Sequence, residues 1–226
     1  MIAKDLSMYA ISNWSGYKTS ITENSKSDKG NPLVESDIEV YNFDKIVKDM
    51  FPHTDCPSST DGIKFKGNTI QLIEFKSGFK QKISKQRFDV KKGTCPKSEE
   101  VCSDYWGVFW ENQERKINQL VESIKLKAIE SYILLEKNVF PLCDDIEKPN
   151  NIILSVVVDE DGVDGIEDIL ADVAEYQPDT NNCLISIKNA LRRLIKQKDA
   201  NNNDYFYDQI DVYSATEYMK KIESIA

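Results

Sequence analysis

Two acidic residues and a lysine in one short stretch of the chain have the types and the spacing for metal-assisted chemistry. The pair Gly67-Asn68 separates two runs of alternating apolar residues, a pattern that predicts a β-hairpin with a two-residue turn. With that turn, Asp61 stands opposite Glu74, and directly opposed Cβ atoms lie only about 5 Å apart. Two such carboxylates repel, and a divalent cation bound between them would relieve the repulsion. The sequence therefore predicts a cation site, with Lys76 beside it as a fixed positive charge.

Side chains along a strand alternate between two faces, so one face of the predicted hairpin is apolar and ends in charged residues. Its members are Asp61, Ile63, Phe65, Ile70, Leu72, Glu74 and Lys76. A one-residue slip in the pairing would put the two acids on opposite faces. The prediction of a cation site therefore depends on the position of the turn.

An Asp, a short gap and then Glu-x-Lys at the end of an apolar strand resembles the motif of the PD-(D/E)XK nucleases, with Thr60 in place of the Pro. In that superfamily the Asp and Glu ligate magnesium, and the Lys positions or activates the attacking water. The resemblance implies that Asp61 and Glu74 hold Mg²⁺ or Mn²⁺, and that Lys76 activates water or stabilises charge. It also implies an α/β, restriction-endonuclease-like fold, in which helices flank a mixed central sheet that carries the hairpin.

Many nucleases of this superfamily add a glutamate from the helix before the first motif strand, and the resemblance implies Glu39 for that position as a third metal ligand. Residues 38–51 carry apolar residues at helical spacing and are followed by Pro52, so a helix is predicted there. In that helix Glu39 lies one turn before Phe43. Glu35 is the second candidate. The alternative for Glu39 is an ordinary first-turn acid, favoured by the helix dipole.

Other interpretations of the chemical residues stay open. Glu74 and Lys76 could form a structural ion pair on an exposed edge strand. A zinc site is a further candidate, because zinc accepts cysteine and histidine ligands at short spacings. Its ligands would be His53, Cys56, Cys95 and Cys102.

Hydrophobic periodicity predicts the remaining elements. The unbroken apolar run from Ile152 to Val158 predicts an interior strand next to the hairpin, and residues 113–137 predict a helix that covers the sheet. The other predicted elements are a polar loop over 20–37, a loop or insertion over 89–107, helices over 164–176 and 183–198, a strand over 206–213 and a helix over 215–225.

Composition is that of a soluble globular protein, and the 226 residues predict one domain over 1–226. No apolar run approaches the roughly 18 residues of a membrane span. Five cysteines and no secretory signal predict a cytoplasmic protein with free thiols. The net charge of −9 argues against a nucleic-acid coat protein, but local basic patches can still bind nucleic acid.

Two basic patches are candidates for nucleic-acid binding, with an ordinary solvated face as the alternative for each. The first follows the motif and contains Lys80, Lys82, Lys85 and Arg87. The second contains Lys188, Arg192, Arg193, Lys196 and Lys198.

Three functions are therefore consistent with the sequence. The first is a Mg²⁺-dependent nuclease that hydrolyses phosphodiester bonds of DNA or RNA. The second is an inert nuclease-like module that binds a protein or nucleic-acid partner, in conflict between phage and bacteria. The third is a structural interaction protein with Asp61 protonated or solvated. Because two facing carboxylates repel, Asp61→Asn is expected to stabilise the metal-free protein.

Overall fold

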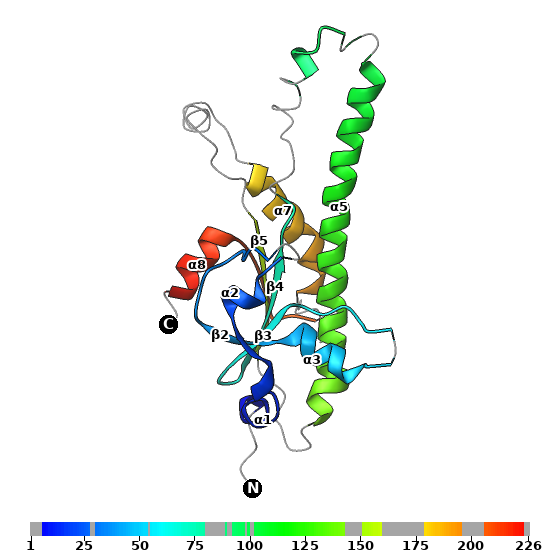
Figure 1. Ribbon diagram of the computed structural model, residues 1–226. Helices are drawn as coiled ribbons and strands as arrows, with labels where there is room; N and C mark the ends of the chain where they lie inside the picture. Colours follow the sequence, from blue (N-terminus) through cyan, green and yellow to red (C-terminus); the bar gives the residue numbers. More distant parts are fainter. Residues whose placement is uncertain are drawn as a thin grey trace, which may run out of the picture.

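The computed structural model describes residues 6–27, 30–53, 55–79, 89, 92–97, 99, 102–142, 151–159, 179–195 and 206–223. They form a six-stranded mixed sheet with helices on both faces (Figure 1). The predicted α/β architecture, a mixed central sheet flanked by helices, is therefore confirmed.

The strands lie in the sheet in the order in which they occur in the chain. The first four form an antiparallel meander, and the last two add in parallel. They are β1 (Lys18–Ser20), β2 (Glu39–Asn42), β3 (Gly62–Lys66), β4 (Thr69–Lys76), β5 (Asn151–Val158) and β6 (Gln209–Ser214).

The helices differ greatly in length, and one of them is far longer than the sheet needs. They are α1 (Leu6–Asn13), α2 (Ile21–Asn24), α3 (Phe43–Met50), α5 (Ser103–Leu134), α7 (Asp179–Leu191) and α8 (Ala215–Glu223). A π-helical turn, η3 (Leu135–Val139), continues α5, and the 3-10 turns are η1 (Ser15–Tyr17), η4 (Phe140–Leu142) and η5 (Arg192–Leu194).

The sheet separates two apolar cores. In the larger core, side chains of α1, α3, α5 and α7 cover one face, where Leu72 and Leu154 are fully buried. In the smaller core, α2 and α8 cover the other face, where Ile73 and Val157 are fully buried. Neighbouring residues of β4 thus point into different cores, as strand alternation requires.

The predicted hairpin forms in the predicted register. Lys66 pairs with Thr69 and Ile63 pairs with Leu72 across β3 and β4. Gly67 has a φ of +56°, which glycine adopts at little cost. The interior strand is also confirmed, because β5 lies between β4 and β6 and buries side chains on both faces.

Several predicted boundaries are wrong, and the helix over 38–51 is the most consequential. Its first part is the strand β2, in which Val40 and Tyr41 point into opposite cores, and α3 begins only at Phe43. Asn42 separates the two elements, because its side-chain oxygen accepts the backbone N–H of Lys45 as a helix cap.

The other differences are shifts of helix and strand ends. The polar loop over 20–37 contains α2, which Ser20 caps by accepting the N–H of Glu23 at 3.2 Å. The long helix starts at residue 103, so the loop over 89–107 ends earlier than predicted. The helix predicted over 183–198 is α7, which starts and ends earlier, and β6 and α8 match the last two predictions to within a few residues. The helix over 164–176 lies outside the described residues.

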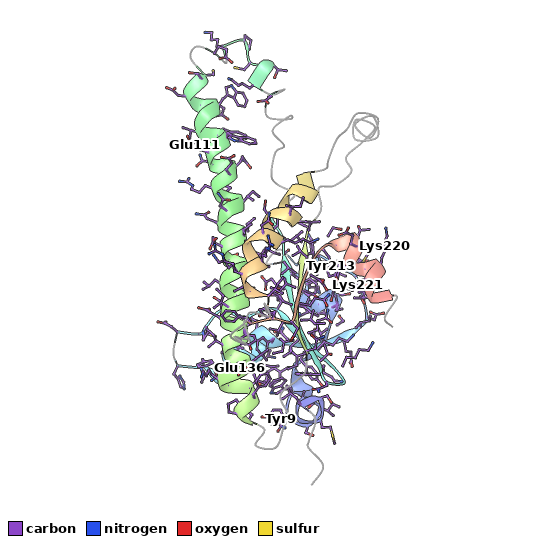
Figure 2. All side chains as sticks on the ribbon, turned by 180° about the vertical axis from the view of Figure 1, so that it is seen from behind. Tyr9, Glu111, Glu136, Tyr213, Lys220 and Lys221 are labelled. Carbon is purple, nitrogen blue, oxygen red and sulfur yellow. The ribbon has the colours of Figure 1, made fainter. Side chains whose placement is uncertain are left out.

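The N-terminal half of α5 projects beyond the sheet (Figure 1). None of its side chains before Ile117 is buried, whereas Ile117, Val121, Ile124 and Ala128 are buried in the larger core. Figure 2 shows Glu111 on the projecting part, at the opposite end of the long helix from Glu136. Across the described residues, no helix has an apolar stretch long enough to cross a membrane.

Candidate functional site

The end of the hairpin brings Asp61 and Glu74 together. Asp61 directly precedes β3, and one step beyond the Gly62–Ile73 pair it stands opposite Glu74. Its carboxylate Oδ2 accepts the backbone N–H of Phe75 at 2.7 Å. The register thus places the two acids opposite each other, as the sequence predicts.

A lysine of α5 lies between the two carboxylates. The Nζ of Lys127 is 3.1 Å from Oδ1 of Asp61 and 2.9 Å from Oε2 of Glu74. One ammonium thus bridges both acids and compensates the repulsion that the sequence argument assigned to a metal ion. We call Asp61, Glu74 and Lys127 the acid–lysine cluster.

Sequence reasoning missed Lys127, although a signal was present. Lys127 is three residues after Ile124 and four residues before Ser131, both of which are buried. Side chains at these spacings share one face of a helix. A lysine on the buried face of an amphipathic helix needs an acidic partner, and that requirement indicated a charged site under the helix.

The cluster is deeply placed, and its burial is uneven. The side chain of Glu74 is 1% exposed, whereas those of Asp61 and Lys127 are 23% and 25% exposed. Oε1 of Glu74 is buried and has no hydrogen-bond partner among the described residues. Most buried polar atoms in proteins have such a partner. Glu74 is thus a carboxyl group with one oxygen paired and the other without a partner among the described residues.

Burial shifts the protonation of all three groups. It raises the pKa of Glu74 to about 8, with the Asp61 charge adding to the shift and the Lys127 charge opposing it. Burial also raises the pKa of Asp61. For Lys127, burial acts to lower the pKa, but the charges of Glu74 and Asp61 outweigh it and raise that pKa. Burial thus favours the neutral forms of the two acids, and the charge of Lys127 opposes that effect.

Lys76 lies beside the cluster without belonging to it. It follows Glu74 by two residues on the same strand, so both side chains point to the α5 face of the sheet. Its charge lowers the pKa of Glu74, which indicates that the two groups are close. No hydrogen bond or ion pair joins the Lys76 ammonium to another of the described residues.

The backbone around the cluster is held by side chains of α5. Oγ of the buried Ser131 accepts the N–H of Thr60 at 2.8 Å, and Oε2 of Glu130 accepts the N–H of Ser58 at 2.5 Å. These contacts lie next to Lys127 on the helix. They hold the backbone of residues 58–60, which directly precede Asp61.

A buried aspartate fixes the segment that follows β4, at the same open end of the hairpin. Asp159 follows β5, and its carboxylate accepts the N–H groups of Gly78 and Phe79 at 2.8 and 2.9 Å. Its own N–H donates to the carbonyl of Lys76 at 3.2 Å. The carboxyl ends of β4 and β5 are thereby held together beside Lys76.

The structure does not bring Glu39 to the cluster. Glu39 lies on β2, is mostly exposed, and accepts a hydrogen bond from Lys18 Nζ at 3.0 Å. Because Tyr41 pairs with Ile63, Glu39 is four residues along the sheet from the level of Asp61, about 13 Å. Glu35, the second candidate, is exposed before β2.

The helix before the motif does carry an acid near the site, at a different position. Asp44 in the first turn of α3 adds to the upward shift in the pKa of Asp61 through its charge. Its two carboxylate oxygens contact Ser59 Oγ at 3.3 Å and Lys48 Nζ at 2.5 Å.

The basic patches are only partly described. Lys80, Lys82, Lys85 and Arg87 lie outside the described residues, as do Lys196 and Lys198. Lys188, Arg192 and Arg193 are exposed at the end of α7 and in η5. Their part in nucleic-acid binding stays a prediction.

The candidate zinc ligands do not converge in the described part of the chain. No three cysteine, histidine or acidic side chains there lie close enough to hold a metal ion. Cys95 and Cys102 contact each other through their thiols, and Cys56 is exposed in the segment after α3. No zinc site is therefore formed by the four residues as they are placed.

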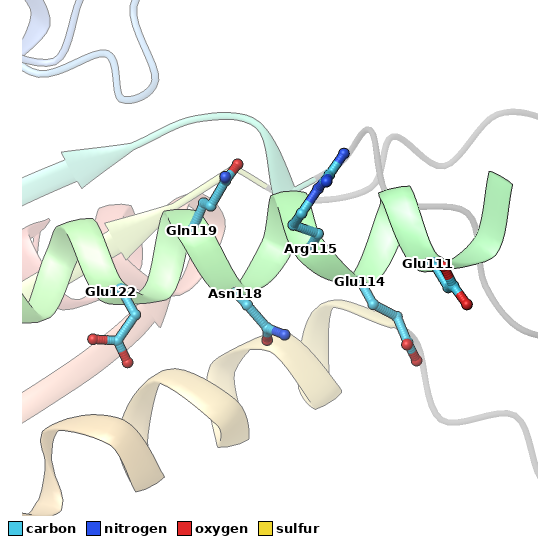
Figure 3. A pocket seen from close by; sticks show the side chains of 6 residues that line it. All are labelled: Glu111, Glu114, Arg115, Asn118, Gln119 and Glu122. Atoms are coloured by element: carbon cyan, nitrogen blue, oxygen red, sulfur yellow. The ribbon is translucent and has the colours of Figure 1, made fainter. Parts of the chain in front are cut away.

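A surface hollow of about 410 Å³ lies elsewhere, along α5 (Figure 3). Its lining contains no residue of the acid–lysine cluster and mixes acidic, basic and amide side chains. They are Glu111, Glu114, Arg115, Asn118, Gln119 and Glu122. Since all six belong to one helix, the hollow is an open side of α5 and offers no converging chemical groups.

Among the described residues, the acid–lysine cluster and the neighbouring Lys76 have a geometry that can support chemistry. Comparisons with protein-family models, with curated proteins and with solved structures find no match for this chain.

Proposed function

We propose that this chain is a metal-dependent nuclease with a restriction-endonuclease-like fold, which hydrolyses phosphodiester bonds of DNA or RNA. The observation that carries the proposal is the state of Glu74. Its carboxylate is almost fully buried, leaves Oε1 without a partner among the described residues, and meets Asp61 around a single cation. A fold that serves structure alone gains little from a half-satisfied buried acid.

The residues of the cluster suit a small divalent cation. Mg²⁺ takes oxygen ligands, and proteins usually hold it by one or two carboxylates while it keeps several waters. Asp61 and Glu74 supply two carboxylates around one point, and Oε1 of Glu74 is free to add a contact. These two residues would hold Mg²⁺ or Mn²⁺. When bound, the ion supplies a Lewis acid that orients the phosphate and lowers the pKa of a bound water.

The lysines take the remaining roles. The Lys76 ammonium, beside Glu74, would hold the attacking water or stabilise the negative charge that develops on the phosphate. Asp61 is the more exposed of the two acids, so a phosphodiester would approach from its side. The proposal assigns contacts with the nucleic-acid backbone to Lys80, Lys82, Lys85 and Arg87, which follow the motif in the sequence.

A cleavage assay on single- and double-stranded DNA and RNA tests the proposal. Wild type is expected to cut at least one of the four substrates with Mg²⁺ or Mn²⁺, and none with EDTA. Lys76→Ala is expected to lose about 100-fold or more of this activity, because it removes a charge at the reacting phosphate. The matched control is Lys66→Ala, at the exposed end of the same hairpin, which should keep full activity.

Thermal unfolding of the same proteins completes the test. A ligand that binds only the native state raises the melting temperature as its concentration rises. Wild type should therefore gain stability from Mg²⁺ or Mn²⁺. Lys76→Ala should show a cooperative unfolding transition, which indicates that the variant is folded. No gain from either metal, together with no cleavage of any substrate, contradicts the nuclease.

A second function, an inert module that binds a basic protein partner, is favoured by Lys127. Its ammonium already compensates Asp61 and Glu74, so the acid pair persists without a metal ion. The net charge of −9 suits a basic partner. For this module, Mg²⁺ and Mn²⁺ should leave the melting temperature unchanged. Metal-dependent stabilisation would count against it.

A further inference from the structure

We propose that Lys127 is a built-in competitor for the metal, so that its ammonium and a divalent cation exclude each other from the place between Asp61 and Glu74. This inference rests on the proposed function, because it concerns filling of the same site. Lys127 would then set the metal concentration at which the site becomes loaded.

The distances require the exclusion. The ammonium lies 3.1 and 2.9 Å from one oxygen of each acid, which places it where a cation shared by the two carboxylates would lie. Magnesium–oxygen contacts are shorter still, about 2.1 Å. A metal ion on both carboxylates would therefore be within contact distance of Nζ, and two positive charges at that separation repel strongly. Loading the site requires the ammonium to move away.

The Lys127 side chain can move away from the acid pair. It is 25% exposed, whereas the side chain of Glu74 is 1% exposed, so the lysine is the group that can turn towards solvent. Its four-carbon stem is flexible, and an ammonium bonds well in many directions.

The competition also selects the charge of the incoming ion. Na⁺ or K⁺ would replace one positive charge by another and gain no electrostatic stabilisation. A divalent cation brings one charge more than the ammonium that it displaces. Lys127 thus favours divalent over monovalent ions, and in their absence its ammonium compensates the negative charge of the acid pair.

Mn²⁺ titration of the full chain, followed by electron paramagnetic resonance at fixed pH and salt, tests the inference. Lys127→Met removes the competitor and should bind Mn²⁺ about tenfold tighter or more, since a buried charged hydrogen bond no longer has to be broken. The matched control is Lys125→Met, two residues away on α5, where the lysine contacts Glu122 at 3.5 Å at the surface. It should bind Mn²⁺ as wild type does.

Lys127→Met leaves two facing acids and can lose stability without metal, so a second variant and a second measurement are included. Lys127→Arg keeps the charge and should bind Mn²⁺ no tighter than wild type. The rise in melting temperature with Mn²⁺ should be larger for Lys127→Met than for wild type. Equal or weaker binding by Lys127→Met, or tighter binding by Lys127→Arg, would overturn the competition.

The outcomes separate this inference from the nuclease itself. Mn²⁺ binding in the expected order without cleavage supports the competition and contradicts the nuclease. Cleavage with equal Mn²⁺ affinities in wild type and Lys127→Met supports the nuclease and contradicts the competition. No Mn²⁺ binding by any of the four proteins overturns both.

Discussion

Glu74 is a carboxyl group whose folded environment favours its neutral form. Burial is the larger cause and the Asp61 charge the second, and together they raise its pKa to about 8 from the ordinary 4.5. Between these two pH values the unfolded chain has released a proton that the folded protein keeps. By linkage, the free energy of unfolding must fall as pH rises through this window.

Glu74→Gln should therefore flatten the pH dependence of stability. In metal-free buffer, wild type is expected to lose stability steadily from pH 5 to pH 8, with a slope of at most about 1.4 kcal/mol per pH unit from this group. Urea unfolding at four pH values measures the slope. The control is Glu39→Gln, an exposed acid on β2, which should keep the wild-type slope. Equal slopes for wild type and Glu74→Gln would show that folding does not raise the pKa of Glu74.

Asp61→Asn is expected to destabilise the metal-free protein, the opposite of the expectation from repulsion alone. The reason is Lys127, which loses one of its two carboxylates, while the new amide brings N–H donors towards an ammonium. A cost of roughly 1–3 kcal/mol follows from a disrupted charged hydrogen bond. Urea unfolding at pH 7 with EDTA measures it.

Asp37→Asn, at an exposed position before β2, is the control for Asp61→Asn and should be close to neutral. If Asp61→Asn is more stable than wild type, repulsion between the acids outweighs their shared ion pair. Lys127 would then hold the site less firmly than its distances indicate.

At the scale of elements, α5 both covers the sheet and builds the site. Lys127, Glu130 and Ser131 share one stretch of the helix and reach Glu74, Ser58 and Thr60 respectively. A shift of the helix by one turn would break all three contacts together. Site geometry is thus coupled to the docking of α5.

Ser131→Ala should weaken this docking. The Thr60 N–H is buried and would lose its acceptor, which costs about 1–3 kcal/mol. Ser123→Ala on the same helix is the control, because the Ser123 hydroxyl donates to the carbonyl of Leu120 within the helix. Urea unfolding measures the difference between the two variants. A cost for Ser131→Ala no larger than for Ser123→Ala would mean that Thr60 finds another acceptor.

The hairpin was predictable because its information is local. The Gly67-Asn68 turn and the alternation around it determine the register, and the register alone places Asp61 opposite Glu74. The strand β5 was equally clear from its unbroken apolar run. These patterns need no knowledge of the rest of the chain.

Other features depend on tertiary packing and were missed. Val40, Phe43 and Val47 have the spacing of a helical stripe. A strand of four residues is too short to show its own alternation, so the sequence predicts a helix where β2 forms. Lys127 meets Glu74 across 53 residues of sequence. Which helix residue faces which strand residue depends on how side chains of the larger core interlock, and no local pattern encodes it.

At the scale of the whole molecule, stability should be distributed unevenly. β4 and β5 are interior strands with buried side chains on both faces, whereas α5 has no buried side chain before Ile117. Amide hydrogen exchange should be slowest in β4 and β5 and should become fast along α5 on the N-terminal side of Ile117. Residue-resolved exchange measures this boundary. Uniform protection along α5 would indicate that its projecting half is covered by a further contact.

The chain order of the cluster also has a consequence for synthesis. Asp61 and Glu74 belong to a local hairpin, while Lys127 lies in the crossover connection between the parallel strands β4 and β5. Local contacts form early, and those that close long loops form late. On the ribosome the two acids are therefore made, and can pair their strands, well before the lysine exists. The nascent hairpin carries an uncompensated acid pair, and the arrival of α5 ends that stage of folding.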